Sequence, residues 1–461
     1  MKKTWIFFIA ACLLLCLIPS VGMLFFPTTK SSENKPMAEA PRLLTEEGKV
    51  NTAVFSQFET WFNQRIALRN QLLYADAVVQ TNLFQESNVS GVIKGTDGWL
   101  YYTDTLDDYL GTDVMTDREL YNLANNFSLV EQYLQERSID FLLTIAPNKN
   151  TLYGENMPYH KSVIANEDHS AVLLQPYLQA QNVNYLDLFG LFNQQEEVLY
   201  LKGDSHWNNK GAYLVFCSIM DEFALPYTQY DQPQPTENQN GDLNRMLYGF
   251  YGPAEQDYAY DLAGNYRYEK EGTSVEDGWI ITGNAQGSGT LLMFRDSFAN
   301  NLIPFFSEQF ATAYYSKGEP NALEWYVESY TPDQVVIQKV ERNIANYLND
   351  PPVLTPPQTQ LPDQIAIAET DTQIHLENAT SDMRYYRISG AVDESRMAVD
   401  SQIVVRVGDT YYRAYQTGEN GFALYLKKEA VEGEEVKLQV YLVNGDSCVQ
   451  ATSQMATIPN E

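Results

Sequence analysis

Hydrophobic residues along the chain recur with two periods, and each period predicts a kind of element. From Val54 to Phe84, apolar residues are spaced three and four positions apart, which predicts one or two amphipathic helices. Residues 89–102 alternate around a Thr-Asp-Gly turn and predict a strand hairpin, and a helix is expected at 117–136. A continuous apolar run at 138–146 is typical of a strand buried on both faces of a parallel sheet.

The same order of strand, polar loop and helix recurs further along the chain, at residues 183–223, 287–310 and 332–348. Strands that alternate with helices in this way predict an α/β sandwich with a mostly parallel sheet over residues 51–349. In such folds ligands bind at the carboxyl ends of the strands.

Polar clusters fall at those strand ends, at residues 147–150, 204–208 and 295–297. A long polar segment at 226–289 interrupts the pattern. A structureless segment of that length inside a domain is either functional or a sign that its elements have been missed. We interpret it as an insertion near the site.

The C-terminal part has a different pattern. Residues 349–362 are rich in proline, and we expect a stiff, extended linker within 350–370. Residues 371–461 contain short alternating segments separated by Gly, Asn and Asp, which predict a small all-β sandwich domain.

Residues 1–26 begin with two lysines and continue as an apolar run long enough to cross a bilayer. We expect a membrane anchor within residues 1–28, with the lysines in the cytoplasm and the rest of the chain outside. A cleaved signal peptide is the alternative, and would make the protein secreted, but the run exceeds a usual signal core and lacks a clear cleavage site. Residues 29–50 are predicted to be a flexible tether that holds the domain off the membrane.

Charge narrows the choice of partners. The chain has 60 acidic and 30 basic residues, a formal charge of −30, and therefore repels nucleic acid and anionic lipid headgroups. Two cysteines in the exported part, Cys217 and Cys448, are far apart in the sequence, and we expect both to be unpaired.

Ser297 lies where an apolar strand turns into a helix. A serine at that point can attack a carbonyl while helical N–H groups stabilise the oxyanion. The sequence Asp-Ser before a helix is equally expected from N-capping alone. Both interpretations stay open at this stage.

A nucleophilic serine needs a base, and His206 with Asp204 supplies a base and a group that orients it. Side chains two positions apart on an extended segment share a face, so the carboxylate can reach one ring nitrogen. The alternative is a structural histidine beside Trp207 in the core. Asp-x-His alone makes a weak metal site, and we expect no metal and no cofactor.

The other three histidines, His160, His169 and His375, are predicted to be ordinary surface residues. After the first buried strand, Asn148 and Lys149 are candidates to stabilise an oxyanion, although a strand-ending turn explains the same residues.

Five segments in this order resemble the AlgX/AlgJ-like branch of the SGNH hydrolase superfamily, the alginate O-acetyltransferases, whose Gram-positive members are named for a DHHW-like motif. They are GTDGWLYY (95–102), APNKNTLY (146–153), GDSHWNNKGAY (203–213), FRDSFANNLIPFFSEQF (294–310) and PDQVVIQKVERNI (332–344). The resemblance covers residues 50–349 and implies an SGNH-like three-layer sandwich.

In this branch the Asp-x-His precedes the serine, so the resemblance implies Asp204, His206 and Ser297 as a catalytic triad. Two positions depart from the family pattern. Arg295 replaces the usual glycine, and either crowds the turn or supplies a cation to the site. Ser205 replaces a second histidine, which leaves His206 as the base. Trp207 joins Asn148, Lys149 and Arg295 as a substrate-binding candidate.

The resemblance implies transfer of an acetyl group to hydroxyls of an exopolysaccharide or cell-wall glycan outside the membrane. It also implies a membrane-bound O-acyltransferase as the partner that supplies the acetyl group. The β-sandwich at 371–461 is a candidate carbohydrate-binding module. A secreted carbohydrate acetylesterase with the same triad, and a non-catalytic envelope scaffold or glycan-binding protein, are the alternatives.

Overall fold

The structure is a computed structural model. It describes the whole chain apart from residues 1, 31–36, 46–47, 158, 231, 239–240, 319–320, 368–373, 379–383, 432–434 and 458–461.

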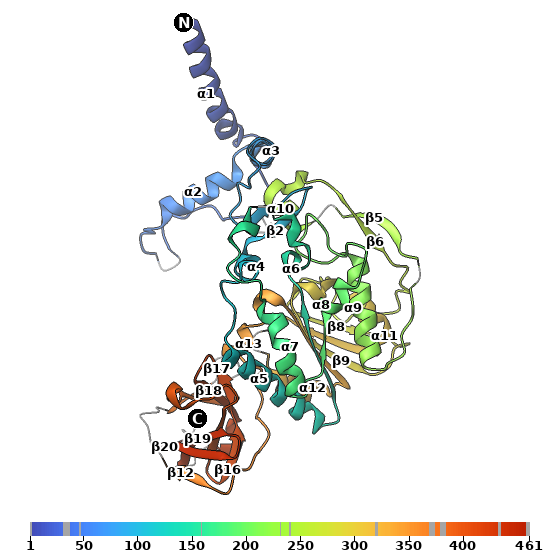
Figure 1. Ribbon diagram of the computed structural model, residues 1–461. Helices are drawn as coiled ribbons and strands as arrows, with labels where there is room; N and C mark the ends of the chain where they lie inside the picture. The colour runs from blue at the N-terminus through green and yellow to red at the C-terminus, as the bar shows by residue number, and fades with distance from the viewer. Residues whose placement is uncertain are drawn as a thin grey trace.

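A seven-stranded sheet forms the centre of the α/β domain (Figure 1). Its strands are β3 (Asp140–Ala146), β4 (Tyr185–Leu186), β7 (Arg267–Tyr268), β8 (Trp279–Gly283), β9 (Thr290–Phe294), β10 (Thr312–Ser316) and β11 (Gln334–Val340). Across the sheet they lie in the order β4, β3, β11, β9, β10, β8, β7. The pairs from β4 to β10 are parallel, whereas β8 pairs antiparallel with both β10 and β7.

Helices cover both faces of this sheet. One face packs against α5 (Asp117–Gln135), α7 (Ser170–Ala180), α12 (Leu323–Tyr330) and α13 (Asn346–Asn349). The other packs against α8 (Leu188–Asn193), α9 (Asn209–Glu222) and α11 (Ile303–Gln309). In β3, Phe141 and Leu143 belong to the first core and Leu142 and Ala146 to the second, because successive side chains point to opposite faces.

Local sequence explains where the main helices begin. Thr116 and Glu119 form a reciprocal capping box at the start of α5, and the Asn208 side chain accepts a hydrogen bond from the N–H of Gly211 at the start of α9. The helix predicted at 117–136 and the strand predicted at 138–146 are both confirmed.

The N-terminal part contains α1 (Lys2–Gly22), α2 (Val54–Arg65), α3 (Arg69–Val79) and a π-helical turn at Gln80–Phe84. The hairpin predicted at 89–102 is confirmed as β1 (Val92–Lys94) and β2 (Leu100–Tyr102), and α4 (Leu106–Leu110) and α6 (Lys149–Tyr153) follow. By length and composition, Thr4–Gly22 of α1 is apolar enough to cross a membrane or to serve as a signal sequence.

The segment at 226–289 is not the single polar insertion that we expected. It contains a ribbon of β5 (Gln234–Asn238) and β6 (Glu255–Ala259) with α10 (Asp242–Tyr248) between them. Its last part supplies β7 and β8 to the main sheet. The apolar run of β8 was overlooked because it is only five residues long and lies between glycine-containing turns.

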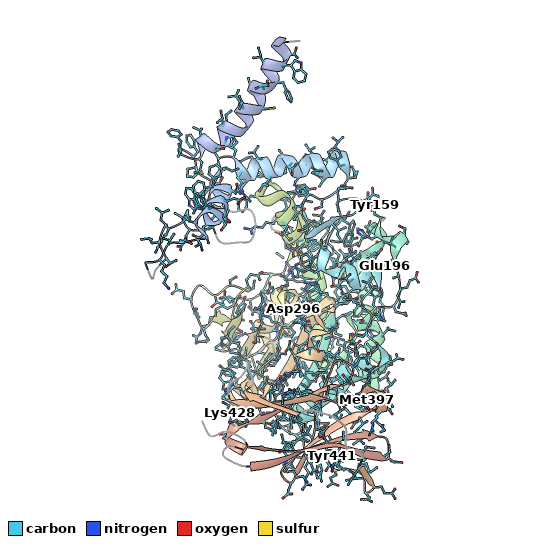
Figure 2. The ribbon with its side chains drawn as sticks, turned by 90° about the vertical axis from the view of Figure 1, so that its left-hand side faces the viewer. Tyr159, Glu196, Asp296, Met397, Lys428 and Tyr441 are labelled. Carbon is cyan, nitrogen blue, oxygen red and sulfur yellow. The ribbon has the colours of Figure 1, made fainter. Side chains whose placement is uncertain are left out.

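The C-terminal region is rich in β-strands, as predicted. Its elements are β12 (Ile365–Ile367), β13 (Ile374–Asn378), β14 (Tyr385–Ala391), β15 (Gln402–Val407), β16 (Thr410–Arg413), β17 (Tyr415–Thr417), β18 (Gly421–Lys427), α14 (Lys428–Val431), β19 (Glu435–Asn444) and β20 (Ser447–Thr457). Within the described ranges these strands make two sheets, ordered β12-β20-β19-β15-β16 and β13-β14-β18-β17. Figure 2 shows this region, marked by Lys428 and Tyr441, at the opposite end of the molecule from α1, with Asp296 between the two ends.

The proline-rich segment before this region packs against the α/β domain. Residues 351–354 are buried, and the backbones of Val353, Asn321 and Glu324 are hydrogen-bonded to one another. A connection held in this way fixes the C-terminal region instead of spacing it from the rest.

Cys217 and Cys448 are both free, as predicted; of the cysteines whose side chains the structure describes, none forms a disulfide.

Candidate active site

Three predicted side chains meet at the carboxyl end of the main sheet. The distance from Nε2 of His206 to Oγ of Ser297 is 2.8 Å, and that from Nδ1 of His206 to Oδ1 of Asp204 is 2.6 Å. One nitrogen of the imidazole therefore faces a carboxylate while the other faces a hydroxyl. This order of groups can move a proton from the serine to the histidine.

The turn after β9 presents Ser297. The helical cap is Asp296, whose Oδ1 accepts from the N–H of Phe298 at 2.9 Å. Its other oxygen, Oδ2, accepts from the N–H of Val340 at 2.6 Å and so ties the end of β9 to the end of β11. Because Asp296 caps the turn, the hydroxyl of Ser297 is left to face His206.

The buried side chain of Lys149 holds the loop that carries Asp204 and His206. The ammonium group of Lys149 donates to the carbonyls of Leu201, Lys202 and Asp204 at 3.1, 2.8 and 2.5 Å. Lys149 is only 3% exposed, so our prediction that it faces an oxyanion is corrected: its charge supports the loop.

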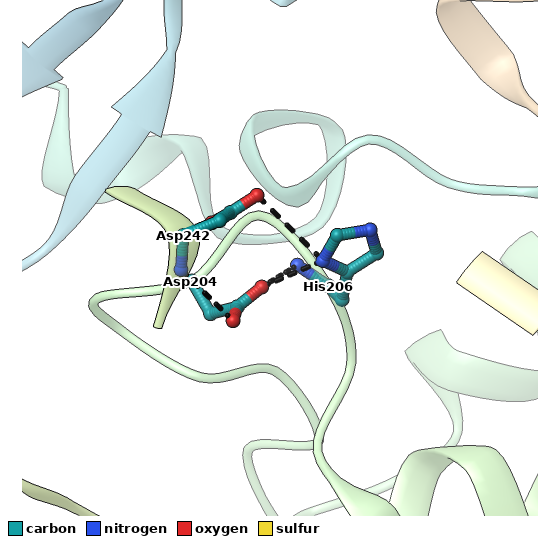
Figure 3. A group of neighbouring side chains, drawn as sticks. All are labelled: Asp204, His206 and Asp242. Atoms are coloured by element: carbon teal, nitrogen blue, oxygen red, sulfur yellow. Dashed lines mark hydrogen bonds and ion pairs between the residues drawn. The ribbon is translucent and has the colours of Figure 1, made fainter. Parts of the chain in front are cut away.

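A second carboxylate, Asp242, lies beside the same histidine (Figure 3). Its Oδ1 accepts from the N–H of Ser205 at 2.7 Å, and its Oδ2 accepts from the Ser205 hydroxyl and lies 3.7 Å from Nδ1 of His206. The N–H of Asp242 in turn donates to Oδ2 of Asp204 at 3.1 Å. Asp242 therefore positions both the Asp204 carboxylate and the residue that replaces the second histidine.

Close packing brings α10 to this loop. A Cβ atom added at Gly203 would lie 1.9 Å from Nδ2 of Asn244, and one added at Gly241 would lie 2.5 Å from the carbonyl oxygen of Gly203. Glycine at both positions lets the start of α10 approach the backbone of the loop.

The surroundings shift the pKa values of the three charged groups. Burial lowers the pKa of His206, but the charge of Asp204 and its hydrogen bond, with the charge of Asp242, outweigh burial and raise that pKa above its ordinary value. Burial opposes ionisation of Asp204, yet His206 and backbone N–H donors lower its pKa to about 2. Burial and the nearby charge of Asp204 raise the pKa of Asp242.

Asp204, His206 and Asp242 are also the described residues whose potential metal-ligand atoms lie within 4.8 Å of one another. Their carboxylate oxygens already accept from the N–H groups of Ser205, His206 and Asp242 and from the imidazole. The donor set fits a hydrogen-bonded base more closely than a metal site.

A cavity of about 990 Å³ opens over Ser297 and His206. Its walls include Tyr102, Asp257, Glu276 and the two arginines Arg245 and Arg342. The guanidinium group of Arg342 lies over the rings of Tyr102 and Phe298, at 5.4 and 5.9 Å from their centres. A cavity with this polar lining can hold a hydroxyl-rich substrate.

Two further candidates have other partners. Asn148 is fully buried, donates to Oδ2 of Asp108 at 2.7 Å, and does not line the cavity. Arg295 donates to Oδ1 of Asn300 at 2.6 Å and to the carbonyls of Val275 and Asp277. The Arg295 cation therefore fixes the loop beside the cavity and is not directed at a substrate.

Trp207 is fully buried against Phe192 and Phe298 and contributes one wall of the cavity. His169 differs from our prediction of an ordinary surface residue. Its Nδ1 lies 3.5 Å from the almost fully buried carboxylate of Glu341, which also accepts from the N–H of Asn148. His169 thus belongs to a buried polar network beneath the site.

Sequence reasoning missed Asp242, Arg245, Glu276 and Arg342. Three of them lie in the segment at 226–289, and Arg342 follows β11. The signal available was the position of Arg342, two residues beyond the end of β11, because ligands bind at the carboxyl ends of such strands.

Comparison with known families gives one match. Residues 92–284 match the family described as the SGNH hydrolase-like domain of the acetyltransferase AlgX. The match includes Asp204 and His206 and ends before Ser297. No curated protein sequence matches the chain.

Several solved structures are similar to the chain. A DHHW family protein from Eubacterium siraeum is 15% identical over 55% of this chain and 91% of that chain, with a TM-score of 0.41. PatB1 from Bacillus cereus is 17% identical over 55% and 96%, with a TM-score of 0.42. AlgX from Pseudomonas aeruginosa is 12% identical over 79% and 90%, with a TM-score of 0.36. The sequence match over residues 92–284 therefore relates this part of the chain to the SGNH hydrolase-like domain of the acetyltransferase AlgX.

Proposed function

We propose that the protein is an extracytoplasmic O-acetyltransferase that moves an acetyl group through an acyl-serine to hydroxyls of a polysaccharide. The observation that carries the proposal is the contact of 2.8 Å between Nε2 of His206 and Oγ of Ser297, with Asp204 behind the ring at 2.6 Å. The match of residues 92–284 to an acetyltransferase family supports the choice of acetyl as the group transferred.

In the first half of the reaction, Nε2 of His206 takes the proton of the Ser297 hydroxyl as Oγ attacks the carbonyl carbon of the acetyl donor. The N–H of Ser297, at the start of its helical turn, is placed to stabilise the oxyanion, and Arg342 offers further donors from the cavity wall. The bond from the acetyl carbon to the donor oxygen then breaks, and His206 returns the proton to that oxygen. An acetyl-serine remains.

In the second half, His206 takes the proton of a sugar hydroxyl, and the sugar oxygen attacks the acetyl carbon. The bond from Ser297 Oγ to that carbon breaks, and the proton returns to Oγ. The enzyme is restored and the sugar carries the acetate ester. Transfer requires that the sugar hydroxyl, and not water, occupies the cavity at this step.

The remaining assignments complete the proposal. Residues 51–349 form the SGNH-like three-layer domain with a mostly parallel sheet, and residues 371–461 form a β-sandwich that serves as a carbohydrate-binding module. The helix at Thr4–Gly22 keeps the catalytic domain beside a membrane-bound O-acyltransferase that supplies the acetyl group.

The test is incubation of the purified full chain with 4-nitrophenyl acetate and a panel of oligosaccharides, followed by mass spectrometry of the sugars. Acetylated sugar supports the transferase. Free acetate without acetylated sugar supports a carbohydrate acetylesterase, and no turnover of the ester supports a non-catalytic scaffold.

Ser297→Ala should lower kcat/KM for the ester by about 10³-fold or more, because the covalent intermediate cannot form. Ser218→Ala is the matched control, since Ser218 lies on α9 and donates only to the carbonyl of Leu214. Full activity of Ser297→Ala would rule out the triad. The melting temperatures of both variants should stay close to that of the natural protein.

A further inference from the structure

The helix α2 separates apolar and polar residues onto two faces. At 3.6 residues per turn, its apolar side chains recur at spacings of three and four and share one face. This apolar face of α2 consists of Val54, Phe55, Phe58, Trp61 and Phe62. The polar side chains between them, among them Gln57, Thr60 and Asn63, point to the other side of the helix.

The apolar face of α2 is only partly covered by the described residues: Val54, Trp61 and Phe62 are half-buried, and Phe55 and Phe58 are exposed. No residue of α2 is buried, and Phe55 and Phe58 are 84% and 49% exposed. The rings of Phe58, Trp61 and Phe62 contact one another, with centres 5.9 Å apart in each pair that includes Phe58. Contiguous apolar surface of this kind marks a face that contacts another molecule or a membrane.

The end of α1 is joined to the end of α2. The N–H of Ala67, just after α2, donates to the carbonyl of Pro19 in α1 at 3.0 Å. Thr28 donates from its N–H to the carbonyl of Arg65 at 3.1 Å and from its hydroxyl to that of Ile66 at 2.7 Å. The residue just before the predicted tether at 29–50 is therefore folded back onto the end of α2.

The hydrogen bonds between the ends of α1 and α2 set how far α2 lies from the membrane and in which direction it runs. Since Thr4–Gly22 has the length of a membrane span, Pro19 and Gly22 lie at the membrane surface when α1 spans the bilayer. Figures 1 and 2 show that α2 runs across the direction of α1 and not along it. The exposed Leu24, Phe25 and Phe26 follow shortly after Gly22 in the chain.

We propose that the apolar face of α2 lies in the interfacial layer of the outer leaflet, in contact with lipid. Helices with one aromatic face and one polar face occupy this layer, where rings of Trp and Phe are favoured. The proposal rests on α1 being a membrane anchor and is independent of acetyl transfer. It gives the protein a second attachment to the membrane, parallel to its surface.

The test places a nitroxide label at single positions of α2 in the full chain, reconstituted in nanodiscs of zwitterionic phospholipid. Phe58→Cys and Phe55→Cys carry the label on the apolar face, and Thr60→Cys is the matched control on the polar face. The natural cysteines are replaced by alanine, and mass spectrometry verifies that Thr4–Gly22 is present.

Labels at 55 and 58 should collide with dissolved oxygen several-fold more often than with a water-soluble nickel complex, and the label at 60 should show the reverse. Equal access of the nickel complex to 58 and 60 would overturn the proposal. Protection of 58 from both reagents would also overturn it, because a protein partner or a second copy would then cover the face. Two positions on the apolar face are labelled so that the test still gives a result if one of the two variants fails to fold.

Discussion

At the scale of single residues, the second carboxylate beside His206 controls when the histidine can act as a base. Asp242 lies 3.7 Å from Nδ1 of His206, and its charge helps to raise the pKa of that group. In the proposed mechanism the histidine accepts the serine proton only when neutral, so activity should rise as pH rises through this pKa.

Asp242→Asn removes one negative charge and should lower the pKa of His206. The acidic limb of kcat/KM against pH, measured with the acetyl ester between pH 5 and 9, should therefore move to lower pH. A purely structural role would lower the rate and leave the midpoint of the limb unchanged. Asp257→Asn is the control, because Asp257 lines the same cavity but is held by the N–H groups of Asn209 and Tyr258.

The residues that sequence reasoning identified are those with local signals. Asp204 and His206 are two positions apart, and Ser297 closely follows an apolar strand, so spacing made each a candidate, and the family resemblance implied that the three form a triad. Asp242 has no such pattern, because its contact with Ser205 spans 37 positions. Lys149 was misassigned because a sequence does not show which way a long side chain turns.

At the scale of elements, α5 joins the α/β domain to the C-terminal region through polar contacts. Arg118 is buried and donates to the carbonyls of Val399, Ser401 and Glu419, and to the side chain of Gln416. One turn further on, Asn122 donates to the carbonyl of Gly418. The contacts extend along one side of the helix.

Arg118→Ala should destabilise the joint, because each buried acceptor left without a donor costs about 1–3 kcal/mol. We expect calorimetry to show the C-terminal region unfolding in a separate transition at lower temperature. Arg396→Ala, which alters an exposed contact with Asp393, should change stability by less than about 0.5 kcal/mol. A single unchanged transition for Arg118→Ala would contradict this role of α5.

Elements with long periodic patterns were predictable, and short ones were not. The capping box and amphipathic pattern of α5 and the apolar runs of β3 and β11 fixed the centre of the fold. β8 and β10 have five residues each and the edge strand β7 has two, and none of them leads directly into a helix, whereas the equally short β9 continues into the helical turn at Ser297. Their places depend on pairing with distant strands, which a local pattern does not contain.

At the scale of the whole molecule, one buried acid links stability to pH. Burial raises the pKa of Asp108 to about 7 from an ordinary 3.8, and the nearby charge of Glu341 contributes. Between pH 3.8 and about 7, Asp108 therefore stays protonated in the folded protein, whereas it has lost that proton in the unfolded chain. The stability that Asp108 contributes is complete below pH 3.8 and is lost as pH rises through about 7.

Asp108→Asn keeps an acceptor for Asn148 and cannot ionise. The difference in unfolding free energy between this variant and the natural protein should grow in favour of the variant by about 1.4 kcal/mol per pH unit between pH 4 and 7. Urea unfolding at several pH values measures this slope. Asp446→Asn, in an exposed turn, should show the same change of unfolding free energy with pH as the natural protein. If Asp108→Asn also showed the same pH dependence as the natural protein, the assignment to Asp108 would be disproved.

The position of β11 determines when the proposed site can assemble during synthesis of the chain. β11 is the last strand of the main sheet to be made, yet it lies between β3 and β9. A ribosome that has finished Ser297 has produced the three residues of the proposed triad and none of β11, the strand that lies beside β9. The newborn chain therefore carries a dormant nucleophile until about residue 340 is free to fold.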